Sequence, residues 1–384
     1  RTMQYRKFGK LGFDVSILGF GCMRLPLLPG VDGSEPDPGI IDEAEAIKMI
    51  RYAIDKGVNY VDTAYNYHRS TSEILVGKAL KDGYRERVKL ATKLPVWLLK
   101  TTGDFDKHLN EQLEKLQTDH VDIYLMHALN KERWNTIKEL DVLGSLKKAI
   151  ESGKVKHAGF SFHEDINFFR TILDSFDWGM CQIMYNYMED REWEKHIGYA
   201  NSKGIAVVLM EPLLGGKLAN DPPAEVANIW KESEYDRSPA EWALRWVYNH
   251  PGITLALSGM STMEQVVENI KIAGDSLPNT LSKKELDTID KVRALYTGMI
   301  KVKCTGCQYC QPCPNNVLIP EIFEHYNNAS AYNTVAKSAA AYKELAEASK
   351  DALQCLECGK CEEACPQKLP IIRHLKEAHE SLSI

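Results

Sequence analysis

Eight of the ten cysteines in this 384-residue chain lie in two short runs near its C-terminal end. Within each run, three cysteines follow one another at x2 spacing and a fourth stands directly before a proline. Three thiolates at this spacing can bind one face of a [4Fe–4S] cluster, while the fourth reaches the cluster of the other run. The spacing therefore predicts two clusters, the first held by Cys304, Cys307, Cys310 and Cys365 and the second by Cys355, Cys358, Cys361 and Cys313.

Two structural zinc sites are the alternative use of these thiols. Zinc usually takes two close pairs of ligands separated by a longer loop, and two tight runs of four fit that pattern poorly. The first run also departs from the usual cluster spacing, with x2 in place of x3 before Cys313. Disulfides are not expected, because the start of the chain lacks an apolar signal segment and indicates a reducing, cytoplasmic compartment.

A second group of reactive side chains lies in the first third of the chain. Asp62, Lys93 and His127 each end an apolar, β-branched run, and Tyr67 follows five residues after Asp62. A lysine ammonium between a carboxylate and a phenol is expected to lower the tyrosine pKa from about 10. Such a tyrosine donates a proton to a developing alkoxide, and a histidine orients the carbonyl. The set suits carbonyl reduction by a hydride that a cofactor supplies.

Taken singly, each of these residues has a more ordinary interpretation. Tyr67 is one of 17 tyrosines, most of which are expected to pack in the core. Asp62 fits a helix cap, Lys93 a surface lysine and His127 a hydrogen-bonded core histidine. The catalytic hypothesis therefore depends on four reactive types falling together at the ends of predicted strands.

Eight short apolar runs alternate with segments of helical periodicity between residues 15 and 257. The predicted strands are Val15–Gly19, Val58–Thr63, Val88–Thr92, Val121–His127, Val155–Ser161, Met180–Tyr185, Ile205–Met210 and Ile253–Leu257. This alternation predicts an α/β fold, a (β/α)8 TIM barrel. A doubly wound sheet would usually show Gly-x-Gly-x-x-Gly after the first strand, and the turn at Gly19 and Gly21 lacks the third glycine. Residues 5–12 are predicted to form a hairpin that closes the barrel floor.

The chain length favours a large domain followed by a smaller one. We predict a barrel over residues 3–298 and an iron–sulfur domain over residues 299–384, mainly helical because residues 330–346 are rich in helix formers. The net charge of −6 gives no reason to expect a nucleic-acid partner. No apolar stretch of about 18 residues predicts a membrane span.

Over about residues 4–296 the chain resembles the aldo-keto reductase superfamily. The stretches that carry the resemblance are Asp62–Tyr67 with Ser72-Glu73, Ala91–Lys93, Asp122–His127, Gly159–Ser161, Gln182–Asn186, Glu211–Leu218 and Ser258–Asn269. The resemblance implies an NAD(P)H-dependent barrel reductase for a small carbonyl substrate. It also implies that Asp62, Tyr67, Lys93 and His127 form the catalytic tetrad, with Tyr67 as general acid.

The same resemblance implies a dinucleotide site. Ser161 and Gln182 match the ligands of the nicotinamide carboxamide. The other expected contacts are Gly21, Met23, Leu213, Gly216, Lys217, Gly259, Met260, Ser261, Gln265 and Asn269.

Several positions depart from the family pattern. Phe162 replaces an asparagine of the carboxamide site, and Met210 or Glu211 replaces an aromatic residue that stacks on nicotinamide. Gly259 and Gln265 replace the two cations that often hold a 2′-phosphate. The choice between NADH and NADPH therefore stays open, and so does a flavin.

Residues 300–375 resemble the α-helical ferredoxins of succinate dehydrogenase-type and heterodisulfide reductase-type subunits. The clusters would either pass single electrons between an external carrier and the barrel, which requires a cofactor such as a flavin, or stabilise the fold of the small domain. A redox-sensing role without turnover, like that of the potassium-channel beta subunits, is a further alternative.

Overall fold

The computed structural model describes residues 2–30, 36–164, 166–189 and 192–384. The chain divides into two compact units, one made of Arg1–Gly215 with Glu241–Leu281, the other of Gly216–Ala240 with Ser282–Ile384. The second unit therefore takes a segment from the middle of the chain as well as its C-terminal part. The boundary predicted after residue 298 stays a prediction.

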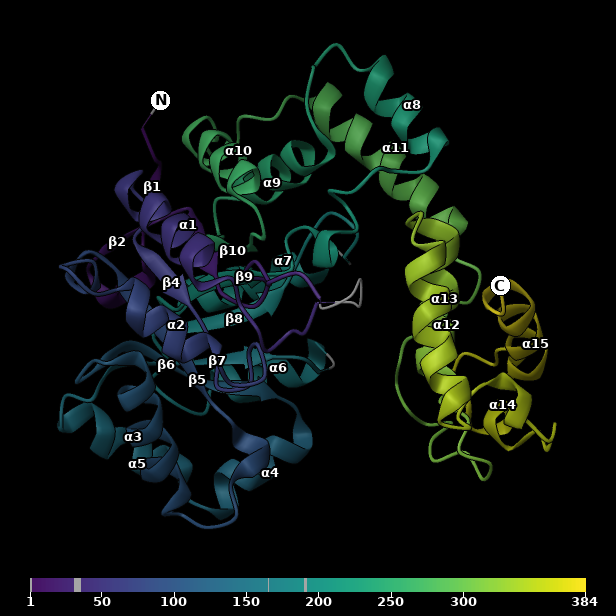
Figure 1. Ribbon diagram of the computed structural model, residues 1–384, viewed down its shortest axis with the longest axis horizontal. Helices are drawn as coiled ribbons and strands as arrows, with labels where there is room; N and C mark the ends of the chain where they lie inside the picture. The colour runs from purple at the N-terminus through teal and green to yellow at the C-terminus, as the bar shows by residue number, and fades with distance from the viewer. Residues whose placement is uncertain (1, 31–35, 165, 190–191) are drawn as a thin grey trace. The chain divides into compact units, whose positions relative to one another are not determined.

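Eight parallel strands in the first unit close into a barrel in the order β10-β3-β4-β5-β6-β7-β8-β9 (Figure 1). The strands are β3 Leu18–Gly21, β4 Tyr60–Asp62, β5 Lys89–Leu94, β6 Val121–Leu129, β7 Val155–Phe162, β8 Met180–Met184, β9 Ala206–Met210 and β10 Leu255–Gly259. The helices of this unit are α1 Glu43–Asp55, α2 Ser72–Ala79, α3 Asp104–Leu116, α4 Lys131–Glu139, α5 Val142–Glu151, α6 Ile166–Leu173, α7 Glu192–Ser202, α9 Pro239–Asn249 and α10 Met263–Gly274. The predicted TIM barrel is confirmed.

An antiparallel hairpin of β1 (Tyr5–Lys7) and β2 (Asp14–Ser16) precedes the barrel. Phe8 between these strands is buried in one hydrophobic cluster with inward-facing barrel residues such as Tyr60 and Leu125, so it fills the barrel interior. The predicted first strand, Val15–Gly19, was wrong in its bounds, because the chain leaves the hairpin after Ser16 and the barrel strand begins at Leu18. No glycine or proline between Val15 and Leu18 signals this break.

The second unit is helical in the described residues, as predicted. Its helices are α8 Ala224–Glu232, α11 Lys283–Met299, α12 Ile319–Ala331, α13 Val335–Glu347, the short α14 Lys360–Ala364 and α15 Ile371–Leu382. Helix α12 packs against α11, α13 and α15. The core between them contains Val317, Phe323, Tyr342 and Leu375, and several cysteines pack against it.

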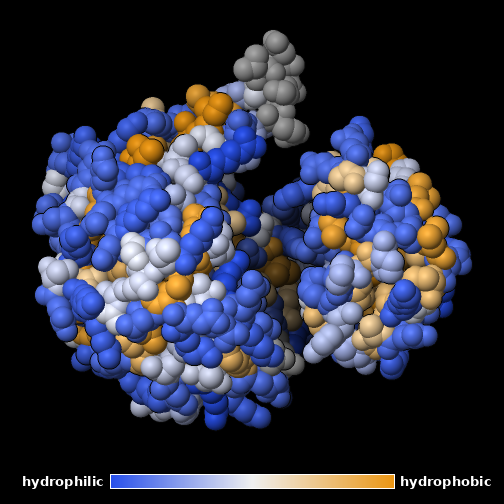
Figure 2. Space-filling model, turned by 90° about the horizontal axis from the view of Figure 1, so that it is seen from below, coloured by the Kyte–Doolittle hydropathy of each residue, from blue (hydrophilic) through white to orange (hydrophobic). Residues whose placement is uncertain are grey.

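Hydrophilic side chains cover most of the face of each unit seen in Figure 2, with hydrophobic residues scattered among them. Among the described residues, every helix is too short or too polar to serve as a membrane-spanning segment.

Candidate active site and cluster sites

The four residues proposed as a tetrad lie at one rim of the barrel. Asp62 is the last residue of β4, Lys93 lies near the end of β5, and His127 lies near the end of β6. Tyr67 lies in the loop that follows β4. Because the strands are parallel, their carboxyl ends meet at the same rim, which is where barrel enzymes place their catalytic groups.

Lys93 is the centre of this group and is fully buried. Its Nζ donates to Asp62 Oδ1 at 2.6 Å, to the Thr63 carbonyl at 2.7 Å and to the Tyr67 hydroxyl at 3.2 Å. The ring of His127 stands nearly perpendicular to that of Tyr67, with centroids 6.2 Å apart. The structure therefore brings all four predicted residues together around one ammonium group.

Burial and charge set the protonation states of the group. Burial alone would lower the pKa of Lys93, but Asp62 and Tyr67 raise it above its ordinary value, so the ammonium stays charged. Burial, with Lys93 nearby, places the pKa of His127 well below its usual range. The imidazole is therefore neutral, and its buried Nδ1 has no hydrogen-bond partner in the described part of the chain.

The expected lowering of the tyrosine pKa was wrong in direction. Burial raises the pKa of Tyr67 above its ordinary value, and the opposing pull of Lys93 does not offset it. The charge of Lys93 is evident from the sequence, whereas the desolvation of the Tyr67 hydroxyl is evident only from the fold. The phenol consequently keeps its proton at neutral pH, as a proton donor must.

A buried hydrogen-bond network behind Lys93 was missed from the sequence. Glu73 Oε1 accepts from Thr92 Oγ1 and from Gln112 Nε2, both at 2.6 Å. The same Gln112 Nε2 donates to the Lys93 carbonyl at 2.9 Å, and its Oε1 accepts from Tyr124 at 2.7 Å. The network fixes the backbone at Lys93 from α2, α3 and β6.

The two predicted carboxamide ligands are adjacent, because Ser161, near the end of β7, and Gln182, in the middle of β8, are paired in register. Both side chains are buried. Gln182 Oε1 has no hydrogen-bond partner among the described residues, and Ser161 Oγ accepts from the Ala128 amide at 2.7 Å. An orphaned, buried amide oxygen at the rim suits a ligand that donates N–H groups.

Arg24, which was not predicted as a site residue, lies between two of the predicted phosphate-binding loops, at Gly215 and Gly259. A Cβ on Gly259 would lie 3.2 Å from its side-chain stem, and a Cβ on Gly215 would lie 3.1 Å from its Nη2. Its carbonyl accepts from Ser261 Oγ at 2.7 Å, and its Nη2 is 3.8 Å from Glu211 Oε1. The available signal was a cation placed shortly after the end of the first barrel strand.

The remaining predicted dinucleotide residues lie in several environments. Gly21 pairs in register with Gly259, Met23 is exposed, Leu213 is half-buried and Met260 is buried. Gln265 Oε1 accepts from the Ser261 amide at 2.8 Å, and buried Asn269 donates to Ser258 Oγ at 3.0 Å.

Gly216 and Lys217 belong to the second unit. Lys217 Nζ lies 3.9 Å from Glu324 and 5.7 Å from the ring centroid of Tyr332. The structure therefore gives Lys217 partners within its own unit.

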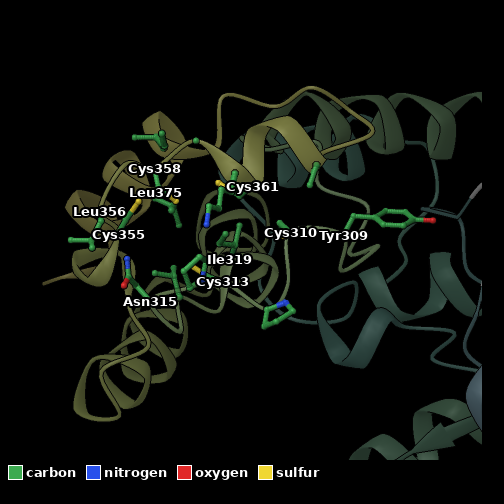
Figure 3. Close-up of a pocket in the computed structure, with 17 residues that line it drawn as sticks. Tyr309, Cys310, Cys313, Asn315, Ile319, Cys355, Leu356, Cys358, Cys361 and Leu375 are labelled. Carbon is green, nitrogen blue, oxygen red and sulfur yellow. The ribbon is translucent and has the colours of Figure 1, made fainter.

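Two neighbouring cavities in the second unit collect the eight clustered thiols. The cysteines that line one cavity are Cys304, Cys307, Cys310 and Cys365. Those that line the other are Cys313, Cys355, Cys358 and Cys361, with Cys310 at its edge. Figure 3 shows Cys313 and Cys361 at this second cavity, with the ring of Tyr309 directed away from them.

The surroundings of the thiols fit iron–sulfur clusters. Ile319 lines both cavities, and the Gly306 and Glu357 amides donate to Cys304 Sγ and Cys355 Sγ, each at 3.4 Å. Hydrogen bonds to sulfur and apolar cover are the features by which a protein tunes such clusters. Among the described residues, no three His, Cys, Asp or Glu side chains converge closely enough to hold a single metal ion.

Comparisons with known proteins give matches to both the barrel and the C-terminal part of the chain. The "Aldo/keto reductase family" model matches residues 18–294, and the "4Fe-4S dicluster domain" model matches residues 303–369. The dicluster match supports iron–sulfur clusters in the C-terminal domain.

Individual relatives cover the barrel part. The probable aldo-keto reductase 1 of Glycine max is 29% identical in an alignment 317 residues long that covers 74% of this chain and 87% of that protein. The aldo-keto reductase YhdN of Bacillus subtilis is 27% identical in an alignment 328 residues long that covers 75% of this chain and 93% of that protein. The solved holo form of aldo-keto reductase AKR11C1 from Bacillus halodurans is 26% identical, with a TM-score of 0.60, over 75% of this chain and 96% of that structure.

Proposed function

This chain belongs to the aldo/keto reductase family and carries a 4Fe-4S dicluster domain, and from that premise we propose that it reduces the carbonyl group of a small molecule with NAD(P)H. The observation that carries the proposal is the contact of one buried ammonium, Lys93 Nζ, with both Asp62 and Tyr67. A lysine held in this way is positioned to act on the tyrosine hydroxyl.

Tyr67 acts as the general acid. When bound, NAD(P)H supplies a hydride to the carbonyl carbon. Tyr67 donates its proton to the carbonyl oxygen, and the charged Lys93, fixed by Asp62, stabilises the phenolate that remains. The neutral imidazole of His127 orients the carbonyl beside the phenol.

The dinucleotide is held at the same rim of the barrel. Ser161 and Gln182 take the carboxamide, for which the unpaired Gln182 oxygen is a ready acceptor. Gly21 and Gly259 pair in register at this rim, and Arg24, whose side chain packs beside Gly259, supplies the cation that positions 259 and 265 lack.

The clusters give the protein a one-electron function beside the two-electron chemistry of the barrel. A flavin-linked exchange of electrons with an external carrier is the second candidate function. It is favoured by the two thiol-lined cavities, and by the absence of the family's asparagine at position 162 and of its two cations at positions 259 and 265. In that case the barrel rim binds a flavin, and carbonyl turnover with NAD(P)H is absent.

Substitution of Tyr67 by phenylalanine tests the proposed reductase. We expect Tyr67→Phe to lower kcat for reduction of an aldehyde panel by about 10²- to 10⁴-fold while dinucleotide affinity is retained. Tyr65→Phe, in the same loop but bonded to Glu111, is the matched control. Absence of turnover by the native, anaerobically purified protein across the panel, with a flavin bound, would favour the electron-transfer candidate instead.

A further inference from the structure

A cation lies next to the proposed catalytic group and is absent from the mechanism above. Arg133 stands in the first turn of α4, where its backbone N–H donates to the Asn130 side chain at 2.8 Å. Its guanidinium carbon lies 5.1 Å from the ring centroid of Trp97, and the Trp97 ring lies 5.1 Å from that of His127. A continuous line of contacts therefore joins Arg133 to the proposed site of carbonyl reduction.

The guanidinium of Arg133 forms few hydrogen bonds with the described residues of the chain. Its Nη1 donates to the Ala128 carbonyl at 2.8 Å, and in the described part of the chain it forms no ion pair. Two other half-buried arginines of the barrel are paired with carboxylates: Arg85 Nη2 lies 3.0 Å from Asp122, and Arg245 Nε lies 2.6 Å from Glu241. Since a guanidinium has five N–H donors, Arg133 keeps most of its hydrogen-bonding capacity free for a ligand.

The charges around Arg133 also favour an anion. Burial and the positive charges of Lys93 and Arg133 lower the pKa of His127, and burial followed by Arg133 lowers that of His163. Both imidazoles are therefore neutral, and of the two cations beside them Lys93 is paired with Asp62 whereas Arg133 forms no ion pair within the described residues. Trp97, next to His127, is 39% exposed, so part of its side chain is accessible to a ligand.

We propose that the carbonyl substrate carries an anionic group, a carboxylate or a phosphate, which Arg133 binds through its free guanidinium N–H groups. The anionic end lies over Trp97, and the carbonyl end reaches His127 and Tyr67. Paired N–H donors match the oxygens of either anion, which is why arginine is common at such sites. The inference rests on the proposed reductase function and adds the chemical class of its substrate.

Matched substrate pairs test the proposal with the anaerobically purified holoenzyme. One pair is 4-oxobutanoate and butanal, which differ by a carboxylate, and the other is glyceraldehyde 3-phosphate and glyceraldehyde. The readout is the ratio of kcat/KM for the anionic aldehyde to that for the neutral one. We expect this ratio to be well above one for the native protein in at least one pair, and the pair that shows it identifies the anion.

Substitution of Arg133 should remove the preference. We expect Arg133→Gln to lower the ratio by about 10- to 100-fold, the range for a hydrogen bond to a charged group, and Arg133→Lys to recover part of it. Lys138→Gln, which removes an exposed charge from the same helix, is the control and should leave the ratio unchanged.

Two results would overturn the inference in different ways. Equal kcat/KM for both members of each pair, with the ratio unaffected by Arg133→Gln, would refute the anionic substrate and leave the reductase function intact. Absence of turnover with all four aldehydes would refute the reductase function itself. The neutral aldehydes report whether the variants are folded.

Discussion

Lys93 determines the chemistry available at the rim, because it is a fully buried charge whose hydrogen-bond partners, Asp62, Thr63 and Tyr67, all belong to this one site. An isolated ammonium in such a position would be neutralised by desolvation. The adjacent carboxylate and phenol keep it charged, while the phenol itself keeps its proton.

The raised pKa of Tyr67 predicts the pH dependence of reduction. A general acid is active while protonated, so kcat should stay nearly constant from about pH 6 to about pH 9 and fall only at higher pH. The imidazole of His127 adds no acidic limb in that interval, because its pKa lies well below its usual value. A pH–rate profile with saturating dinucleotide measures this. Loss of activity centred near neutrality would contradict it.

Arg24 predicts a defect in cofactor affinity. Substitution to alanine should weaken NADPH binding by about 10- to 100-fold, because a charge-assisted contact to phosphate is lost. Fluorescence titration of the dinucleotide measures the Kd. Arg87→Ala, which removes an exposed arginine just before β5, at the opposite end of the barrel strands, is the control. Equal Kd values for the two variants would remove Arg24 from the proposed site.

At the scale of elements, the hydrogen-bond network of Gln112 attaches α3 to β5 and β6. Gln112→Ala removes the hydrogen-bond partner of Tyr124, a donor to the Lys93 carbonyl, and one of the two donors to Glu73 Oε1, which keeps Thr92. We expect the free energy of unfolding to fall by about 2 to 3 kcal/mol, measured by urea denaturation. Glu114→Ala, an exposed change on the same helix, should alter it little. An equal effect of both changes would contradict a specific role for the network.

The elements themselves were largely predictable. Alternating apolar runs and helical patterns predicted eight strands, and the first was misplaced, because no glycine or proline separates Ser16 from Leu18. The residues that support the site were not predictable in the same way. The roles of these residues, Glu73, Gln112 and Arg24, depend on contacts with other elements. A sequence pattern along one segment does not reveal such contacts.

At the scale of the whole molecule, the thiol spacing predicted how distant cysteines share a cavity, because each run can supply only three ligands to its own cluster. Cys365 accordingly lies with Cys304 and not with its own run. The barrel and the cluster domain could be predicted to occur together, but not that residues 216–240 join the second unit. That grouping depends on tertiary packing.

The shared ligands predict paired effects on iron content. We expect the anaerobically purified protein to be brown, to bleach with dithionite and to hold about eight iron atoms. Cys365→Ser should perturb the cluster of Cys304, and Cys313→Ser that of Cys355. Iron and sulfide analysis together with electron paramagnetic resonance distinguishes loss of the Cys304 cluster from loss of the Cys355 cluster.

Cys181→Ala, a buried barrel thiol, is the control and should keep the full iron content. A colourless preparation that contains zinc would contradict the cluster assignment.

The second unit is assembled from two stretches that are far apart in the sequence. Helix α8 packs against α11, and Arg237 Nη2 pairs with Glu285 at 2.7 Å. During translation, α8 therefore leaves the ribosome well before its partner helix exists. The cluster assigned to Cys304 is completed later still, because its fourth thiol, Cys365, lies well beyond α11 in the chain. Loading of that cluster therefore follows the synthesis of α11, and a gene shortened before α11 would yield a chain in which α8 has lost the helix it packs against.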